Sequence, residues 1–203
     1  MSTSIPSTIA VVRHGETDWN LARRIQGRTE VPLNPTGRSQ AAATAALLAA
    51  TGAERGLPWS RVISSPLGRA VETASIIASG IGIAGPDIDA ELWERDFGPA
   101  EGLLVDEVHE RWPGLEIPGA EPVEAVTART SAAFARILDT APGAIVVAHG
   151  AMIRAGLGAF ADGPVSRIEN GAVWLLHRED AAAGIRVSRL HSRPEPEFAR
   201  EAG

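Results

Sequence analysis

Short apolar runs alternate with longer stretches of helical periodicity along this chain. Brief β-branched runs bounded by polar turns are typical of strands buried in a sheet. Such runs occupy residues 9–12, 61–64 and 144–148, and two weaker candidates occupy 172–177 and 185–191. Between them, apolar residues recur every three or four positions, which is the pattern of a helix with one buried face. It predicts helices at about 36–52, 67–78, 105–112, 122–141 and 151–160.

This alternation predicts an α/β fold, a three-layer sandwich with a mainly parallel central sheet flanked by helices. In open parallel sheets, ligands bind in the crevice beyond the carboxyl ends of the strands. His14 and His149 each follow a predicted strand directly, and Arg69 lies in the opening turn of the helix that follows a third. We therefore expect three separate regions of sequence to converge at one edge of the sheet.

Local signals refine the boundaries. Thr36 is the expected N-cap of the first long helix, and Ser65 followed by Pro66 has the composition of a cap and first turn for the next. Residues 91–121 are rich in Gly, Pro and Trp, which predicts a lid or side insertion. The Pro- and charge-rich tail from about residue 192 is expected to be flexible.

Length and composition favour one domain over residues 1–203, because the chain is 44% hydrophobic and long enough for one substantial core. The formal net charge of -6 argues against nucleic acid and anionic membranes as partners. The chain shows neither a membrane span nor the layout of a secretory signal, so a cytoplasmic location is expected. An anionic ligand would need a local cationic pocket.

Three residue types are absent from the sequence: Cys, Tyr and Lys. Without Cys there are no disulfides, thiolate metal sites or Cys nucleophiles. Without Lys there is no Schiff-base chemistry and no P-loop lysine. Mechanisms that need either of these side chains are therefore excluded.

Two histidines share one local context, an apolar strand followed by His-Gly. The sequences are VVRHG around His14 and VVAHG around His149. The glycine lets a backbone turn or a ligand approach closely. A metal pair is the main competing interpretation, but Glu16 and Asp18 do not complete a recognised ligand pattern. A structural role is the default for the other histidines, His109, His177 and His191.

The segment Arg13-His14-Gly15-Glu16-Thr17-Asp18-Trp19-Asn20 resembles the opening signature of the histidine phosphatase superfamily, in its phosphoglycerate mutase-like branch. The same pattern continues in order over residues 26–27, 32–33, 37, 64–74, 92–98, 101–102 and 146–150. Because the ordered matches cover roughly residues 9–170, the resemblance is far more specific than an isolated Arg-His-Gly.

The resemblance implies a reaction and a set of residues for it. His14 would attack phosphorus and carry a phosphohistidine, while Arg13, Arg69 and His149 offset charge on the phosphoryl oxygens. Glu94 matches the proton donor of the family. The resemblance implies no metal and no other cofactor.

Further positions match family contacts to phosphate or to the leaving group. They are Asn20, Gln26, Gly27 and Gly150. Arg23, Arg24 and Arg28 add positive potential nearby, and we interpret them as solvated side chains. Two departures lie in the predicted insertion: Ala100 stands where an aromatic is frequent, and Gly119-Ala120-Glu121-Pro122 replaces Gly-Gly-Glu-Ser. They bear on substrate choice and leave the reaction type unaffected.

Three readings of function stay open. The first is a metal-independent phosphatase acting on a small phosphorylated metabolite. The second is a phosphoglycerate mutase-type transfer. Against it, family mutases carry a longer basic insertion, and here the only basic Arg or Lys residues between Glu94 and Pro122 are Arg95 and Arg111. The third is a non-catalytic phosphate-sensing protein. The sequence decides neither the metabolite nor whether the chain forms a homodimer.

Metal-dependent hydrolysis through Asp87-Ile88-Asp89 is disfavoured. The paired aspartates of that chemistry follow an apolar strand, and here Gly85-Pro86 precede them.

Overall fold

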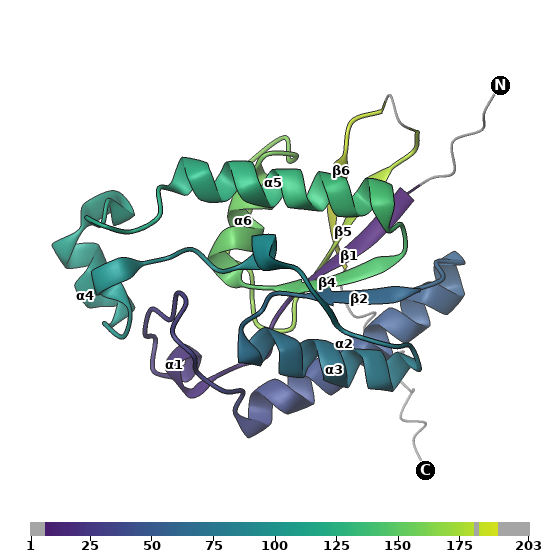
Figure 1. Ribbon diagram of the computed structural model, residues 1–203, viewed down its shortest axis with the longest axis horizontal. Coiled ribbons are helices and arrows are strands. Elements are labelled where there is room, and N and C mark those ends of the chain that lie inside the picture. The colour runs from purple at the N-terminus through teal and green to yellow at the C-terminus, as the bar shows by residue number, and fades with distance from the viewer. Residues whose placement is uncertain (1–6, 181–182, 191–203) are drawn as a thin grey trace, which may run out of the picture.

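The computed structural model describes residues 7–180 and 183–190. A six-stranded sheet stands at its centre with helices on both faces (Figure 1). The strands are β1 (Ser7–Arg13), β2 (Arg61–Ser64), β3 (Asp87–Ile88), β4 (Ala144–Ala148), β5 (Val173–Arg178) and β6 (Arg186–Leu190). The α-helices are α1 (Asp18–Leu21), α2 (Pro35–Arg55), α3 (Gly68–Ile81), α4 (Val105–Arg111), α5 (Val123–Thr140) and α6 (Gly150–Gly158). Short 3₁₀ helices lie at Ala90–Leu92, Gly98–Ala100 and Pro113–Leu115.

The strand order is β3-β2-β4-β1-β5-β6. The first four strands are mutually parallel, and β5 and β6 add an antiparallel pair next to β1. The predicted three-layer α/β architecture with a mainly parallel sheet is confirmed.

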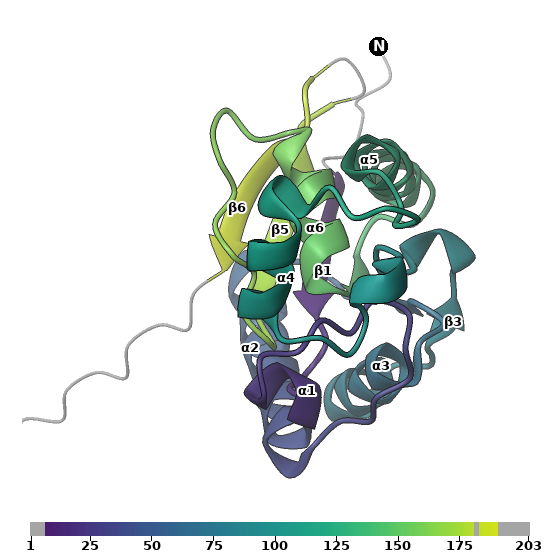
Figure 2. The same ribbon diagram turned by 90° about the vertical axis from the view of Figure 1, so that its left-hand side faces the viewer.

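Successive residues of the central strands point to opposite faces, and both faces are covered (Figures 1 and 2). Ile9 and Val11 of β1 pack in the apolar cluster formed with α5 and α6. Ala10 and Val12 pack in the cluster formed with α2 and α3. All four side chains are fully buried, which explains why β1 has no alternation of apolar and polar residues.

Helix length alone does not make a membrane span. The longest helix, α2, has 21 residues, many of them Ala, Thr or Gly. Within the described part of the chain, no helix combines the length and the hydropathy needed to cross a bilayer.

Two helix starts differ from the sequence-based expectation. The N-cap of α2 is Asn34, whose side-chain oxygen accepts from the Gly37 N–H at 2.8 Å, and Pro35 takes the first helical position. Thr36 therefore lies inside the helix. Helix α3 begins at Gly68 after Leu67, so Ser65 is not its cap. The Ser65 hydroxyl instead bonds the His149 ring at 2.7 Å.

Other differences lie at the edges of the fold. Strand β3 was not predicted, because Asp87 and Ile88 are both exposed and form no apolar run. The four-residue helix α1 was also not anticipated. The predicted tail from about residue 192 and His191 lie outside the described residues.

The predicted insertion folds as a compact excursion at one end of the molecule, with α4 near α1 (Figure 2). Its two ends meet, because the Glu121 N–H donates to the Asp96 carbonyl at 2.8 Å. It has an apolar cluster of its own, separate from the two clusters on the sheet: Phe97, Ala100, Val108 and Ile117. Its role as a lid remains a prediction.

The turn after β1 is held against the start of α2 by direct backbone contact. A Cβ placed on Gly15 would lie 2.2 Å from the Gly37 carbonyl oxygen, and one placed on Gly37 would lie 2.1 Å from the Glu16 carbonyl oxygen. No side chain larger than hydrogen fits without moving the backbone next to His14.

We expect Gly15→Ala to lower the free energy of unfolding by about 1–3 kcal/mol, the usual cost of overpacking a rigid site. Gly158→Ala is the matched control, since Gly158 lies inside α6 and a Cβ there has no neighbour within 4 Å. It should be neutral or stabilising by up to about 1 kcal/mol. Urea denaturation of both variants measures the difference. Equal stability of the two would show that the Gly15–Gly37 contact tolerates a methyl group.

Candidate active site

Three adjacent parallel strands, β2, β4 and β1, deliver the polar cluster at their carboxyl ends. Arg13 is paired in register with Ala148, so the residues that follow, His14 and His149, emerge side by side. Their ring centroids are 5.1 Å apart with planes tilted by 59°. Strand β2 ends at Ser64, and the helix that follows it carries Arg69. The sequence-predicted residues His14, Arg69 and His149 thus occupy one edge of the sheet.

The ring of His14 is 2% exposed and has a defined tautomer. Its Nδ1 lies 2.7 Å from the Gly15 carbonyl oxygen, which can only accept a hydrogen bond. The proton therefore resides on Nδ1, and Nε2 keeps its lone pair. A further bond supports the loop, because the Asn170 side chain donates to the His14 carbonyl at 3.0 Å.

Burial, together with the charges of Arg13 and Arg69, lowers the pKa of His14 well below the ordinary value for histidine. Burial, followed by the charges of Arg69, His14 and Arg13, does the same to the pKa of His149. Both imidazoles are consequently neutral at pH 7. A neutral imidazole has the lone pair that a nucleophile requires.

Two buried arginines flank the histidines, each oriented by backbone carbonyls. Arg69 donates from Nη1 to Thr29 and from Nη2 to Gly27, at 2.8 and 2.7 Å. Arg13 donates from Nη1 to the Ile168 carbonyl at 2.7 Å. Burial lowers the pKa of Arg13 to about 10 and also lowers that of Arg69, although both guanidinium groups stay charged at neutral pH.

Three nitrogen atoms of this cluster have no hydrogen-bond partner among the residues that the structure describes: Arg13 Nε, Arg69 Nε and His149 Nδ1. The two arginine Nε atoms are donors, and a buried donor without a partner is rare enough in proteins to need an explanation such as a bound ion. Two positive charges beside them favour an anion with several acceptor oxygens, such as a phosphoryl group.

The Glu94 side chain lies against the N-terminus of α6, the helix that begins directly after His149. Its Oε1 accepts from the N–H groups of Arg95 and Met152, at 2.8 and 2.9 Å, and its Oε2 accepts from Ala151 at 3.1 Å. These three N–H groups fix the carboxyl group beside the histidine cluster. Arg129 braces the same segment from α5 by donating to the carbonyls of Glu91, Trp93 and Glu94.

Loop residues 20–29 close one side of the cluster. Asn20 Oδ1 accepts from the Asn170 side chain at 3.1 Å, and Gln26 Oε1 accepts from the Thr17 hydroxyl at 3.0 Å.

Gly27 has a φ of 52°, and a Cβ there would lie 1.9 Å from Glu101 Oε1. Glu101 in turn accepts from the Arg28 and Thr29 N–H groups, both at 2.9 Å. It thereby holds the loop whose carbonyls orient Arg69.

A cavity of about 410 Å³ opens over these residues. Its lining includes every sequence-predicted site residue except His149, which is fully buried beneath it. Gly150 lines it close to the Arg13 guanidinium, since a Cβ on Gly150 would lie 3.1 Å from Arg13 Nε. The lining residues are Arg13, His14, Asn20, Arg23, Arg24, Ile25, Gln26, Gly27, Arg69, Glu94, Phe97, Val105, Asp106, His109, Leu115, Gly150, Ala151, Arg154, Arg167 and Ile168.

Several lining residues were not part of the predicted site. Arg23 and Arg24 are exposed, as expected, yet they belong to the cavity wall. His109 lies on α4 facing the cavity, whereas His177 bonds the Thr8 hydroxyl at 2.8 Å within the sheet. Arg154 and Arg167 come from α6 and the loop that follows it, and no motif had singled them out.

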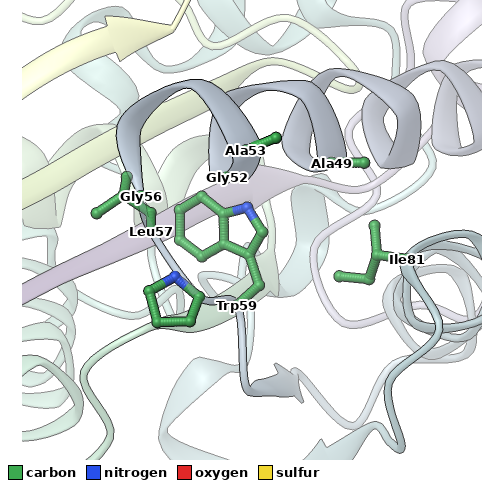
Figure 3. A pocket seen from close by; sticks show the side chains of 8 residues that line it. Ala49, Gly52, Ala53, Gly56, Leu57, Trp59 and Ile81 are labelled. Carbon is green, nitrogen blue, oxygen red and sulfur yellow. The ribbon is translucent and has the colours of Figure 1, made fainter.

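Two other features of the described residues lack this combination of groups. A cavity of about 520 Å³ beside α2 is lined by apolar and small residues around Trp59 and contains no titratable group (Figure 3). Asp87 pairs with Arg61, and Asp89 pairs with Arg136 and caps the turn at Glu91. Over residues 7–180 and 183–190, no group of three or more His, Asp or Glu side chains is placed to hold a metal ion.

The sequence also matches a known family over most of its length. The family model described as the histidine phosphatase superfamily, branch 1, matches residues 9–187. The chain belongs to this superfamily. Relatives with curated names include an uncharacterized phosphatase, PhoE, from Bacillus subtilis, 37% identical over 73% of this chain and 75% of its own. Phosphoglycerate mutase-like protein 4 from Arabidopsis thaliana is 39% identical over 72% of this chain and 67% of its own.

Solved structures of other proteins have the same fold. A mycobacterial glucosyl-3-phosphoglycerate phosphatase in complex with VO3 superposes with a TM-score of 0.76 at 25% identity. The match covers 92% of this chain and 100% of the other. The phosphatase and mutase names among these relatives support phosphatase or mutase activity for this member of the superfamily.

Proposed function

We propose that this histidine phosphatase hydrolyses a small phosphorylated metabolite, without a metal ion, through a phosphohistidine on His14. The observation that carries the proposal is the neutral His14 ring, which has its proton on Nδ1 and its Nε2 lone pair free, next to two arginines with unpaired Nε donors. In-line attack on phosphorus needs such a nucleophile and a cationic surrounding for the phosphoryl oxygens.

In the first step, His14 Nε2 forms a bond to phosphorus while the bond from phosphorus to the ester oxygen breaks. Arg13 and Arg69 offset the charge on the three non-reacting oxygens, and the His149 ring lies beside them. Glu94, in its protonated form, gives a proton to the leaving oxygen, so that this oxygen departs as a hydroxyl group and not as an alkoxide.

In the second step, a water molecule takes the place of the departed alcohol. Glu94, now ionised, removes a proton from this water as its oxygen attacks the phosphohistidine. The P–N bond breaks, inorganic phosphate leaves, and both His14 and Glu94 return to their starting protonation. Atoms and charges balance over the two steps without any other reactant.

Mutase chemistry is the second candidate, favoured by the phosphoglycerate mutase names of several relatives. A mutase must retain its phosphorylated intermediate and exclude water. The insertion contributes two arginines, and both are engaged elsewhere. Arg95 donates to the Glu121 and Leu115 carbonyls, and the Arg111 guanidinium lies 4.5 Å from the Trp112 ring centroid. Neither lines the cavity, which supports hydrolysis over retention of a bisphosphate.

A panel of phosphate esters assayed in the presence of a chelator tests the proposal. We expect phosphate release that the chelator does not reduce, together with an acid-labile phosphoenzyme whose label maps to the peptide containing His14. Isomer exchange on 3-phosphoglycerate without phosphate release would establish the mutase instead. Ester binding with neither reaction would identify a phosphate-sensing protein, and loss of activity with the chelator would contradict a metal-independent mechanism.

A further inference from the structure

The cavity around His14 carries more positive charge than one phosphoryl group requires. Six arginines and two carboxylates line it, in a chain whose formal net charge is -6. Arg13 and Arg69 serve the proposed reaction. The remaining four lie around the outer part of the cavity: Arg23, Arg24, Arg154 and Arg167.

Two of these four have structural partners. Arg23 Nη2 pairs with Asp106 of α4 at 2.8 Å, and Arg24 Nη1 donates to the Gly102 carbonyl at 2.7 Å. Both contacts connect the loop after α1 to the insertion, so these arginines are accounted for by holding the two segments together.

Arg154 and Arg167 have no such explanation. Both side chains are exposed, and neither guanidinium group makes a hydrogen bond or an ion pair with any residue in the described ranges. Arg154 lies one helical turn after Gly150 and Ala151, on the face of α6 that lines the cavity. Arg167 directly precedes Ile168, whose carbonyl accepts from Arg13. Both arginines therefore belong to the wall that also carries Arg13.

The cavity also has an apolar share of its lining, which comes from the loop after α1 and from the insertion: Ile25, Phe97, Val105 and Leu115. The volume of about 410 Å³ is in the range typical of small-molecule sites and far exceeds that of a phosphate ion. A substrate filling this space would have its leaving group near these apolar side chains and near two arginines without protein partners in the described ranges.

We propose that the substrate carries a second anionic group, such as a carboxylate, which Arg154 and Arg167 bind while the phosphate ester lies against His14. The planar guanidinium suits paired carboxylate or phosphate oxygens. The proposal rests on the proposed function for the placement of the ester, and it assigns Arg154 and Arg167 the choice of substrate and no part in the chemical steps.

Matched aryl phosphates test this assignment. In each pair, one ester carries a carboxylate at ring position 3 or 4, and the other carries the uncharged carboxamide at the same position. For the better isomer, we expect the wild-type kcat/KM of the carboxylate ester to exceed that of the carboxamide ester by about fivefold to tenfold. This is the size expected for a charged contact that is weakened by solvent exposure. In the double variant Arg154→Gln/Arg167→Gln this preference should disappear, mainly through KM, while turnover of the carboxamide stays within about twofold.

Arg55→Gln is the control for net charge. Arg55 is exposed in the last turn of α2 and does not line the cavity. The preference should survive in this variant. The assignment is overturned if wild type shows no preference, if Arg55→Gln abolishes it equally, or if the double variant loses carboxamide turnover to the same extent as carboxylate turnover.

A binding measurement separates this assignment from the proposed function. Calorimetric titration of both esters into His14→Ala, with and without the two arginine substitutions, requires no turnover. Failure of wild type to release phosphate from either ester would contradict the proposed function alone. Equal affinity of His14→Ala for the two esters would contradict the second-anion site alone.

Discussion

His14→Ala is expected to lower kcat for phosphate release by about 10⁴-fold or more, because without the imidazole no covalent intermediate forms and water must attack the ester directly. Arg13, Arg69 and the cavity remain, so KM should change little. Steady-state phosphate release from the best ester of the panel measures the effect, and the labelled phosphoenzyme should be absent.

His177→Ala serves as the matched control. His177 is a partly buried histidine of β5 that bonds Thr8 and does not line the cavity. We expect its kcat to stay within about threefold of wild type, as for a substitution outside the machinery. Thermal unfolding of both variants tests whether they are folded. A folded His14→Ala protein that retains more than about a tenth of wild-type kcat would rule out His14 as the nucleophile.

Glu94→Gln should separate the two chemical steps. For an alkyl phosphate, whose leaving oxygen needs a proton, we expect kcat to fall by about 10²–10⁴-fold, the usual contribution of a general acid. For 4-nitrophenyl phosphate, whose leaving group departs as a stable anion, the first step should change little. The second step still lacks its base, so a burst of nitrophenol should precede slow turnover while phosphoenzyme accumulates.

Rapid-mixing measurement of the burst, with Glu107→Gln as control, decides the role of Glu94. Glu107 is an exposed carboxylate of α4 outside the cavity. The amide in Glu94→Gln also replaces one oxygen that accepts a backbone N–H, so unfolding must be followed in parallel. If the first step slows equally for both esters in a folded variant, Glu94 holds the structure and does not transfer the proton.

The sheet was predictable where strands are buried on both faces. The apolar runs at 61–64 and 144–148 coincide with β2 and β4. The edge strand β3 left no such pattern, since its two residues are exposed. The start of a helix depends on which nearby polar side chain accepts a hydrogen bond from its first N–H groups. Asn34 with Pro35 begins α2 two residues before Thr36, and the hydroxyl of Ser65 is engaged by His149.

The inner part of the site was visible in the sequence and the outer part was not. His14 and His149 stand at strand ends, and the family pattern supplied Arg69 and Glu94. Arg154 carried no motif, because a single arginine in a helix is ordinarily solvated. Its spacing of four from Gly150 was the available signal, since the two positions share a helix face. Arg167 lies in a loop between α6 and β5, where no sequence periodicity indicates which way a side chain points.

The apolar cluster of the insertion lies apart from the groups that hold Glu94 in place. Phe97, Ala100, Val108 and Ile117 pack with one another, and the segment leaves and rejoins the fold at the Asp96–Glu121 contact. Glu94 precedes this contact and is fixed by backbone groups of α6, which any side chains there would provide. A substitution at Phe97 would therefore reshape the cavity wall without removing the N–H groups that hold Glu94.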